Sequence, residues 1–273
     1  MEWWGNSALL SQAPWSPMQI DTALWLTAKD ASTITLNGST VSQWSDKKGN
    51  GNSVANATGT TQPAYLTTEF NNLPTVRFSF SRQDVLFGNI TGVSSASDFF
   101  IAAVFELRVA IRAWDVVCGF RSAANTSTPG APLLQGMFAA EQIGCHNTDV
   151  TDTRIKVDVT TRLAKRIATL GRSGGTNGNG GTVTVTATSP SQASYLTTAT
   201  QTWTSTTTNG FQLGGRQLNS GSVSFGDKDI CEVICLPYSP STALRQQIEG
   251  YLAHEWLLTS ALPADHPYRN SLP

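Results

Sequence analysis

The sequence predicts an all-β protein, an antiparallel β-sandwich with one short helix near its C-terminus. Short runs rich in Val, Ile, Thr and Phe alternate with turn residues along most of the 273 residues, a rhythm typical of sandwiches and barrels. Charged residues make up 14% of the chain, against about 25% in an average soluble domain. Ser, Thr, Asn and Gly take their place, and the length suits one large β domain.

The first strand is expected over Leu24 to Leu26, and a hairpin follows it in "STITLNGSTVSQW". There Asn37-Gly38 separates two alternating runs, and Asn-Gly is a preferred two-residue turn. The stretch "SDKKGNGN", 45–52, is expected to be a turn, because its spacing does not match that of a calcium loop. Further strands are expected at 75–80, 85–89, 99–107, 115–120, 133–139, 154–159, 166–170, 182–188, 212–216 and 222–236.

One helix is expected after the last strand. Ser239 can cap it, and Pro240 suits the first helical position. Its apolar face is formed at helical spacing by Leu244, Ile248, Tyr251, Leu252 and Trp256. The prolines of "SALPADHPYRNSLP" then end any helix.

Metal and disulfide chemistry are not expected. His254-Glu255 begins like the zinc motif H-E-x-x-H, but Leu258 stands where the second histidine ligand should be. No metal ligands and no cofactor are therefore predicted. The four cysteines, Cys118, Cys145, Cys231 and Cys235, are expected to be small apolar core residues. Residues four apart on one strand stand about 13 Å apart, which is too far for a disulfide.

Charge and hydropathy exclude several partners. The formal net charge is -1 and no basic stripe interrupts the chain, so neither nucleic acid nor a membrane surface is an expected partner. The first residues, "MEWWGNSALLSQAPWSP", do not read as a signal peptide. They contain Trp3, Trp4 and Trp15, which we expect either to pack on their own domain or to dock on a neighbouring subunit.

Two segments carry a resemblance to a known family. These are "WSDKKGNGN…QPAYLTTEFNNLPTVRFSF" and "FQLGGRQLNSGSVSFGDKDICEVICLPYSPSTALRQQIEGYLAHEWLLTSALPADHPYRNSLP". Together they resemble the concanavalin A-like, laminin-G-like jelly-roll domains of bacterial surface proteins and tailed-phage structural proteins. The resemblance implies a jelly roll over 21–238 and a helix with a Pro-rich tail packed on it over 239–273. The tryptophans mark residues 1–20 as an apolar arm ahead of the jelly roll.

Jelly rolls host glycoside hydrolases, lectins and structural modules, so activity has to come from a site. A retaining glycosidase needs two carboxylates about 5 to 5.5 Å apart, and no E-x-D-x-x-E run occurs. In "FGDKDICEV", Asp227 and Asp229 can share a strand face, whereas parity places Glu232 on the other. No G-x-S-x-G motif occurs either. No catalytic residue and no enzymatic activity are expected.

The resemblance implies a structural protein of a tailed-phage particle: a tail, baseplate, fibre or capsid decoration component. It would be made in the host cytoplasm, reside in the virion in several copies, and contact other virion proteins through the tryptophan arm. One alternative is a lectin-like module that binds host-surface glycan, and a second is a glycan hydrolase. For a glycan, the candidate binding pairs are Trp203 with Asn209, and Trp114 with Arg112.

Overall fold

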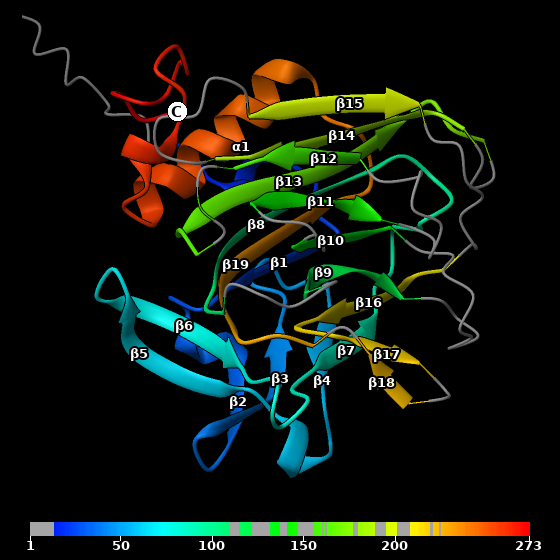
Figure 1. Cartoon of the computed structure of the whole chain (residues 1–273), viewed down its shortest axis with the longest axis vertical. Coiled ribbons are helices and arrows are strands. Elements are labelled where there is room, and N and C mark those ends of the chain that lie inside the picture. Colours follow the sequence, from blue (N-terminus) through cyan, green and yellow to red (C-terminus); the bar gives the residue numbers. More distant parts are fainter. Residues whose placement is uncertain are drawn as a thin grey trace, which may run out of the picture.

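The structure of the chain is a computed structural model (Figure 1). It describes residues 14–109, 115–121, 132–136, 141–146, 155–159, 161, 163–176, 180–188, 195–200, 208–218, 221–223 and 225–273. Within these residues, nearly all regular structure is antiparallel sheet. The predicted all-β sandwich with a C-terminal helix is confirmed.

The strands form two layers. The first runs in the order β15, β14, β13, β8, β19, and both β1 and β6 pair with the far edge of β19. β5 extends this layer beyond β6. The bounds are β1 Leu24–Thr27, β5 Ala64–Phe70, β6 Leu73–Phe78, β8 Phe99–Leu107, β13 Arg166–Ser173, β14 Thr182–Ala187, β15 Leu196–Thr200 and β19 Lys228–Leu236.

The second layer runs in the order β12, β11, β10, β9, β16, β7, β4, β3, β2. The bounds are β2 Ile34–Asn37, β3 Thr40–Ser45, β4 Ser53–Ala55, β7 Leu86–Asn89, β9 Asp115–Arg121, β10 Leu133–Gly136, β11 Gln142–His146, β12 Ile155–Asp158 and β16 Gly210–Leu213. A pairing of β3 with β5 connects the layers. β17 Arg216–Leu218 and β18 Gly221–Val223 form a separate hairpin.

The main core lies between the layers. Phe99 of the first layer meets Phe120 of the second edge-on, with ring centroids 4.9 Å apart, and Phe120 meets Phe211 at 5.8 Å. Every residue of β19 is buried, as are all but one of β8. These two strands are covered on both faces, which explains their long apolar runs.

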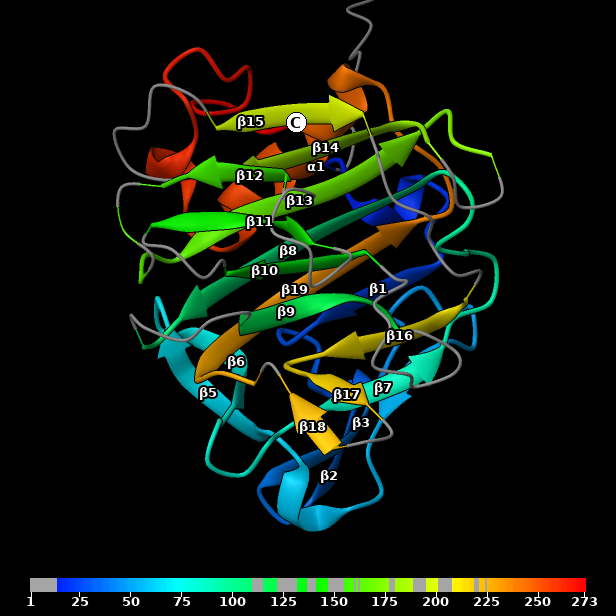
Figure 2. The same ribbon diagram turned by 45° about the vertical axis from the view of Figure 1, so that its right-hand side comes forward.

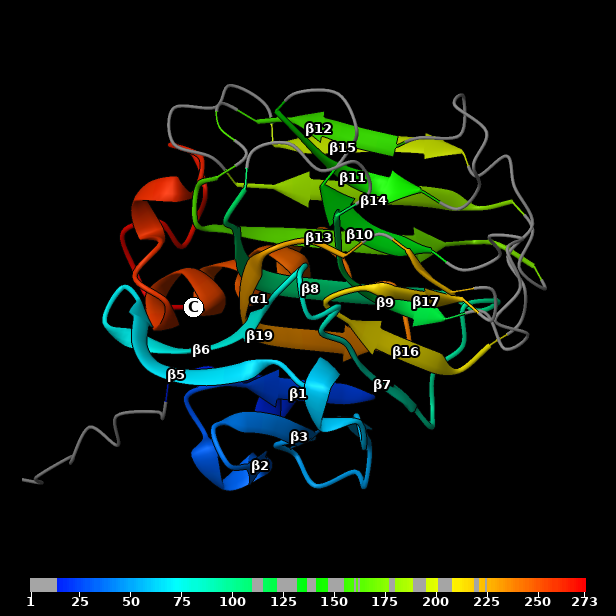
Figure 3. The ribbon, with the colours of Figure 1, turned by 60° about the horizontal axis from the view of Figure 1, so that its bottom comes forward.

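Helix α1, Thr242–Glu255, covers the outer face of the first layer, beside β8 and β13. In Figure 2 β13 and β14 pass in front of α1, and Figure 3 shows α1 beside β13, β8 and β19. Of the predicted apolar face, Ile248, Leu252 and Trp256 are fully buried, whereas Leu244 and Tyr251 are only partly buried. The predicted cap is wrong by two residues: Ser241 is the N-cap, and its Oγ accepts a hydrogen bond from the Leu244 N–H.

Other sequence predictions have clear outcomes. All four cysteines are buried and unpaired. The 45–52 stretch is a turn built around Asp46, whose carboxylate accepts hydrogen bonds from the backbone N–H of Trp25 at 2.6 Å and of Asn50 at 2.8 Å. The single strand expected over 222–236 is instead two strands, β18 and β19, and Phe225, Gly226 and Asp227 lie between them. Strands β4, β5, β11 and β15 were missed by the sequence prediction.

Candidate functional site

A groove opens on the outer face of the first layer, where β13, β14 and β15 pass the start of α1. Its volume is about 360 Å³, near the lower end of the usual range for ligand sites. Three apolar residues contribute to its wall: Phe100, Leu196 and Pro240. Six hydroxyl side chains line it as well, those of Ser173, Thr182, Thr184, Thr198, Ser239 and Thr242. We call this site, together with Arg245 at its inner end, the threonine groove.

The hydroxyls face the groove because of strand alternation. On β14, Val183 and Val185 point into the core and are buried, so Thr182 and Thr184 point outward. Thr184 lies opposite Thr198 of β15, which therefore shares its face. None of the six hydroxyls has a hydrogen-bond partner within the described residues. Within the part of the chain that the structure describes, these hydroxyls can therefore bond to a ligand.

A buried polar network forms the inner end of the groove. Nη1 of Arg245 donates to both carboxylate oxygens of Glu249, at 2.8 and 3.0 Å, and to the Tyr195 hydroxyl at 3.1 Å. Glu249 is fully buried, and it also accepts a hydrogen bond from the Thr186 hydroxyl at 3.0 Å. Nε2 of His266, in the C-terminal segment, lies 3.3 Å from the same carboxylate. Burial raises the pKa of Tyr195, which keeps its hydroxyl protonated.

This network fixes the shape of the groove. It joins β14, the residue before β15, the helix and the C-terminal segment through one carboxylate. The carboxylate of Glu249 neutralises the positive charge of Arg245. A polar ligand in the groove therefore meets hydroxyls and guanidinium N–H groups rather than an unpaired charge. Hydroxyls both donate and accept, and with nearby apolar surface they suit a ligand that carries many hydroxyls of its own.

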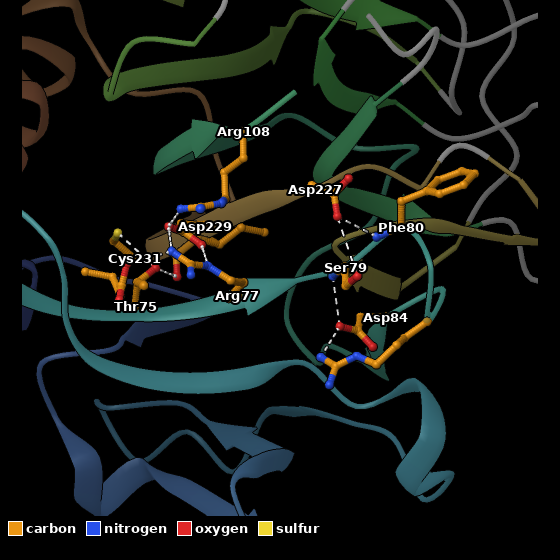
Figure 4. A network of polar contacts seen from close by, with 12 residues as sticks. Thr75, Arg77, Ser79, Phe80, Asp84, Arg108, Asp227, Asp229 and Cys231 are labelled. Carbon is orange, nitrogen blue, oxygen red and sulfur yellow. Dashed lines mark hydrogen bonds and ion pairs between the residues drawn. The ribbon is translucent and has the colours of Figure 1, made fainter. Parts of the chain in front are cut away.

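A second polar cluster surrounds Asp229, one of the two aspartates weighed for catalysis (Figure 4). Asp229 is fully buried, and Arg77 binds it through two hydrogen bonds of 2.8 and 2.9 Å. Arg108 adds a third at 3.2 Å. The hydrogen bonds to Asp229 raise the pKa of Arg77. Both oxygens of Asp229 are thus occupied, which suits a structural role.

Asp227, the other aspartate, belongs to the loop before β19. It accepts hydrogen bonds from the Phe80 N–H at 3.1 Å and from the Ser79 hydroxyl at 3.5 Å. Nearby, Asp84 is fully buried and accepts from Arg82 at 2.6 Å and from the Ser79 N–H at 2.8 Å (Figure 4). Burial raises the pKa of Asp84.

The parity argument for Glu232 is wrong, because β19 contains a bulge at Cys231. Asp229 pairs with Glu106 and Glu232 pairs with Val104, so the two acids share the outer face. Glu232 does not approach a ligand site, however. It is fully buried under α1, where its oxygens accept from the indole N–H of Trp25 at 2.7 Å and of Trp256 at 2.6 Å. Burial raises its pKa.

The binding pairs named from the sequence are not tested. Arg112, Trp114 and Trp203 lie outside the described residues. Asn209 is exposed, and its carbonyl accepts from the Ile90 N–H at 2.8 Å, away from the threonine groove.

Of the assembly candidates, Trp3 and Trp4 also lie outside the described residues. Trp15 is partly buried and meets the Tyr251 ring of α1 edge-on at 5.9 Å. It therefore packs on its own chain. Its contact with a neighbouring subunit stays a prediction.

His254 does not approach a second histidine; its Nε2 lies 2.9 Å from the carbonyl oxygens of Tyr268 and Ser271. Within the described residues, no three His, Cys, Asp or Glu side chains are grouped as a metal site would need. No described helix combines the length and the apolar character of a membrane span.

The sequence prediction missed the threonine groove, although a pattern for it exists. In "GTVTVTATS" every second residue from Thr182 to Thr188 is a threonine, and "YLTTAT" adds Thr198 on the next strand. Alternation places such residues on one face of a sheet. Only the fold shows that α1 covers part of that face and leaves the rest open.

Comparisons with known proteins show the fold. No protein-family model and no curated protein matches the sequence. Among solved structures, an arabinofuranosidase complexed with arabinofuranosyl-α-1,2-xylobiose is similar at a TM-score of 0.56 and 15% identity. A GH54 α-L-arabinofuranosidase soaked with 4-nitrophenyl α-L-arabinofuranoside is similar at 0.55 and 13%. Both alignments cover 81% of this chain but only 51% of the arabinofuranosidase.

A Ruminococcus gnavus sialidase CBM40 bound to α2,3-sialyllactose is also similar, at a TM-score of 0.41 and 9% identity, over 55% of this chain and 80% of its own. At such identities the arabinofuranosidases show a shared fold and no more.

Proposed function

We propose that the chain is a glycan-binding module and that the threonine groove holds the sugar. The observation that carries the proposal is the groove's lining: six hydroxyls without a partner in the described part of the chain, beside Leu196 and Pro240. A sugar ring presents apolar C–H faces together with hydroxyls on its edge. The groove offers a matching surface for both.

A glycan is the first ligand class to test, because the arabinofuranosidase that is similar at a TM-score of 0.56 is complexed with arabinofuranosyl-α-1,2-xylobiose. Binding without hydrolysis is the activity that the described groove residues support. The carboxylate that Arg245 of the groove binds, Glu249, is fully buried and also accepts a hydrogen bond from Thr186. It therefore has no free oxygen with which to protonate or attack a glycosidic bond.

A single shallow groove would bind weakly, with a Kd in the millimolar range, about 4 kcal/mol. Useful adhesion then needs several copies held together. The tailed-phage structural role that the sequence resemblance implies would supply such copies in a virion, together with neighbouring virion proteins. That role, its location and the copy number stay predictions.

The test uses threonine-to-valine variants, which keep the shape and the β-propensity of the side chain but remove the hydroxyl. Thr184→Val and Thr198→Val alter the groove, whereas Thr197→Val makes the same change on the opposite face of β15. Binding would be measured by NMR titration with oligosaccharides first selected on a glycan array. Each groove variant should weaken binding about two- to tenfold, the value of one hydrogen bond.

Thr197→Val should bind like the wild type. Equal binding by all three variants would place the sugar elsewhere, and an array without any bound glycan would remove the proposed function.

A further inference from the structure

We propose that the threonine groove selects a glycan that carries a carboxylate, such as a hexuronic or sialic acid unit. This inference rests on the proposed function and adds the charge of the ligand to it. Two observations support it. Part of the Arg245 guanidinium makes no hydrogen bond to a described residue, and the first turn of α1 contains no acidic side chain; both lie at the same end of the groove.

Arg245 uses only part of its guanidinium within the protein. Its side chain is 10% exposed, and its hydrogen bonds to Glu249 and Tyr195 all come from Nη1. No described residue accepts a hydrogen bond from Nε or Nη2. These two atoms form the edge of a guanidinium that binds a carboxylate through two parallel hydrogen bonds. Because Arg245 lines the groove, a ligand can reach them.

The start of α1 adds two more donors. The helix has 14 residues and no acidic side chain in its first turn. Ser241 satisfies the N–H groups of Leu244 and Arg245. The N–H groups of Thr242 and Ala243 have no acceptor among the described residues. A helix start of this kind favours a negative charge.

The acidic side chain in contact with Arg245 is already paired, and Asp265, whose negative charge acts on Tyr195, does not line the groove. Glu249 is the acidic residue closest to Arg245 in the network, and it accepts hydrogen bonds from Arg245 and from Thr186. A ligand carboxylate would therefore meet N–H and O–H donors. A neutral sugar could accept the same hydrogen bonds, but bonds to an ionised acceptor are roughly twice as strong. Selectivity for the acid follows from this difference.

The experiment compares matched probes by isothermal titration calorimetry. Trigalacturonic acid is set against its methyl ester, and 3′-sialyllactose against lactose, so the two pairs distinguish a uronic from a sialic acid ligand. Within at least one pair the acid should bind about tenfold more tightly at low salt, which corresponds to about 1.4 kcal/mol. The preference should shrink at 0.5 M NaCl because salt screens charge.

Two helix variants place one carboxylate in the first turn of α1. Thr242 lines the groove and is exposed, whereas Ala243 is exposed but does not line it. Thr242→Asp should abolish the preference for the acid, and Ala243→Asp should keep most of it. Both variants should fold, since acidic residues suit a helix start. Arg245→Lys should also lose the preference, because lysine lacks the two-pronged edge.

The outcomes separate the two proposals. Equal affinity for acid and ester, combined with weaker binding by Thr184→Val, would leave a glycan site and overturn its selectivity for carboxylates. Equal loss of preference in Thr242→Asp and Ala243→Asp would also overturn it, because then only overall charge matters. If no probe and no arrayed glycan binds the wild-type chain, the proposed function itself has failed.

Discussion

Replacing Trp256 with Phe tests whether one buried carboxylate fastens α1 to the sheet. Trp256 is fully buried, packs edge-on against Phe70 at 5.9 Å, and donates its indole N–H to Glu232 at 2.6 Å. Trp25 donates to the other oxygen of Glu232 at 2.7 Å. Phenylalanine keeps an aromatic ring at the site and removes the N–H. The change therefore isolates the hydrogen bond better than Trp256→Ala does.

The expected loss follows from two contributions. A buried acceptor left without its donor costs about 1 to 3 kcal/mol, and the smaller ring costs about 1 kcal/mol more, as for the loss of a methylene group. Trp256→Phe should thus lower the free energy of unfolding by about 2 to 4 kcal/mol. Trp256→Ala should cost at least the 3 to 5 kcal/mol typical of large-to-small core changes.

The assay is urea unfolding of four proteins in a double-mutant cycle: wild type, Trp256→Phe, Glu232→Leu and the double variant. Once Glu232 is replaced, the indole N–H has lost its acceptor, so its removal should cost little. The coupling energy should be about 1 to 3 kcal/mol. Leu257→Ala serves as control, because Leu257 is 65% exposed and should change stability by less than about 0.5 kcal/mol. If the stability losses of Trp256→Phe and Glu232→Leu add up to the loss of the double variant within about 0.5 kcal/mol, the hydrogen bond does not have this role.

Three further predictions concern stability and assembly. Ser241→Ala should cost about 1 kcal/mol through loss of the helix cap, while Ser239→Ala should cost little; equal effects in thermal unfolding would contradict the cap at Ser241. Burial raises the pKa of Asp84 in the folded protein. The stability that protonated Asp84 contributes is therefore fully present below its pKa in the unfolded chain and is lost as the pH rises through its pKa in the folded protein. The Tm of Asp84→Asn relative to wild type should therefore increase from pH 3.5 to pH 7, and a constant difference would count against this. Deleting residues 1–16 removes the edge-on contact of Trp15 and should lower the free energy of unfolding by about 1 kcal/mol. The truncated chain should stay folded, and light scattering should show that it no longer joins a larger assembly. Failure to fold would place the arm in the core.

Long strands were predictable from the sequence because burial on both faces leaves an unbroken apolar run, as in β8 and β19. Three of the four missed strands, β4, β11 and β15, have three to five residues each, too few for a clear period. The fourth, β5, has seven residues, but only Phe70 is buried, so it has no apolar run. The bulge at Cys231 leaves no mark in the residue pattern, yet it changes the face of Glu232.

The polar end of the groove was unpredictable for a different reason. Arg245 and Glu249 stand one helical turn apart, a spacing at which an Arg and a Glu commonly pair on an exposed helix surface. Both are instead buried, because Thr186 and His266 reach Glu249 from distant parts of the chain and Tyr195 accepts a hydrogen bond from Arg245. Such tertiary partners have no local counterpart in the sequence.

The position of β19 between β8 and β1 has a consequence for how the chain is made. Trp25 and Glu232, which meet in the finished protein, are 207 residues apart, and β1 pairs along its whole length with β19. Until β19 leaves the ribosome, β1 and the edge of β8 that pairs with β19 lack this strand partner. A fold dominated by such distant pairings forms slowly, and open strand edges invite aggregation. Recombinant yield should therefore improve with slower synthesis and lower temperature.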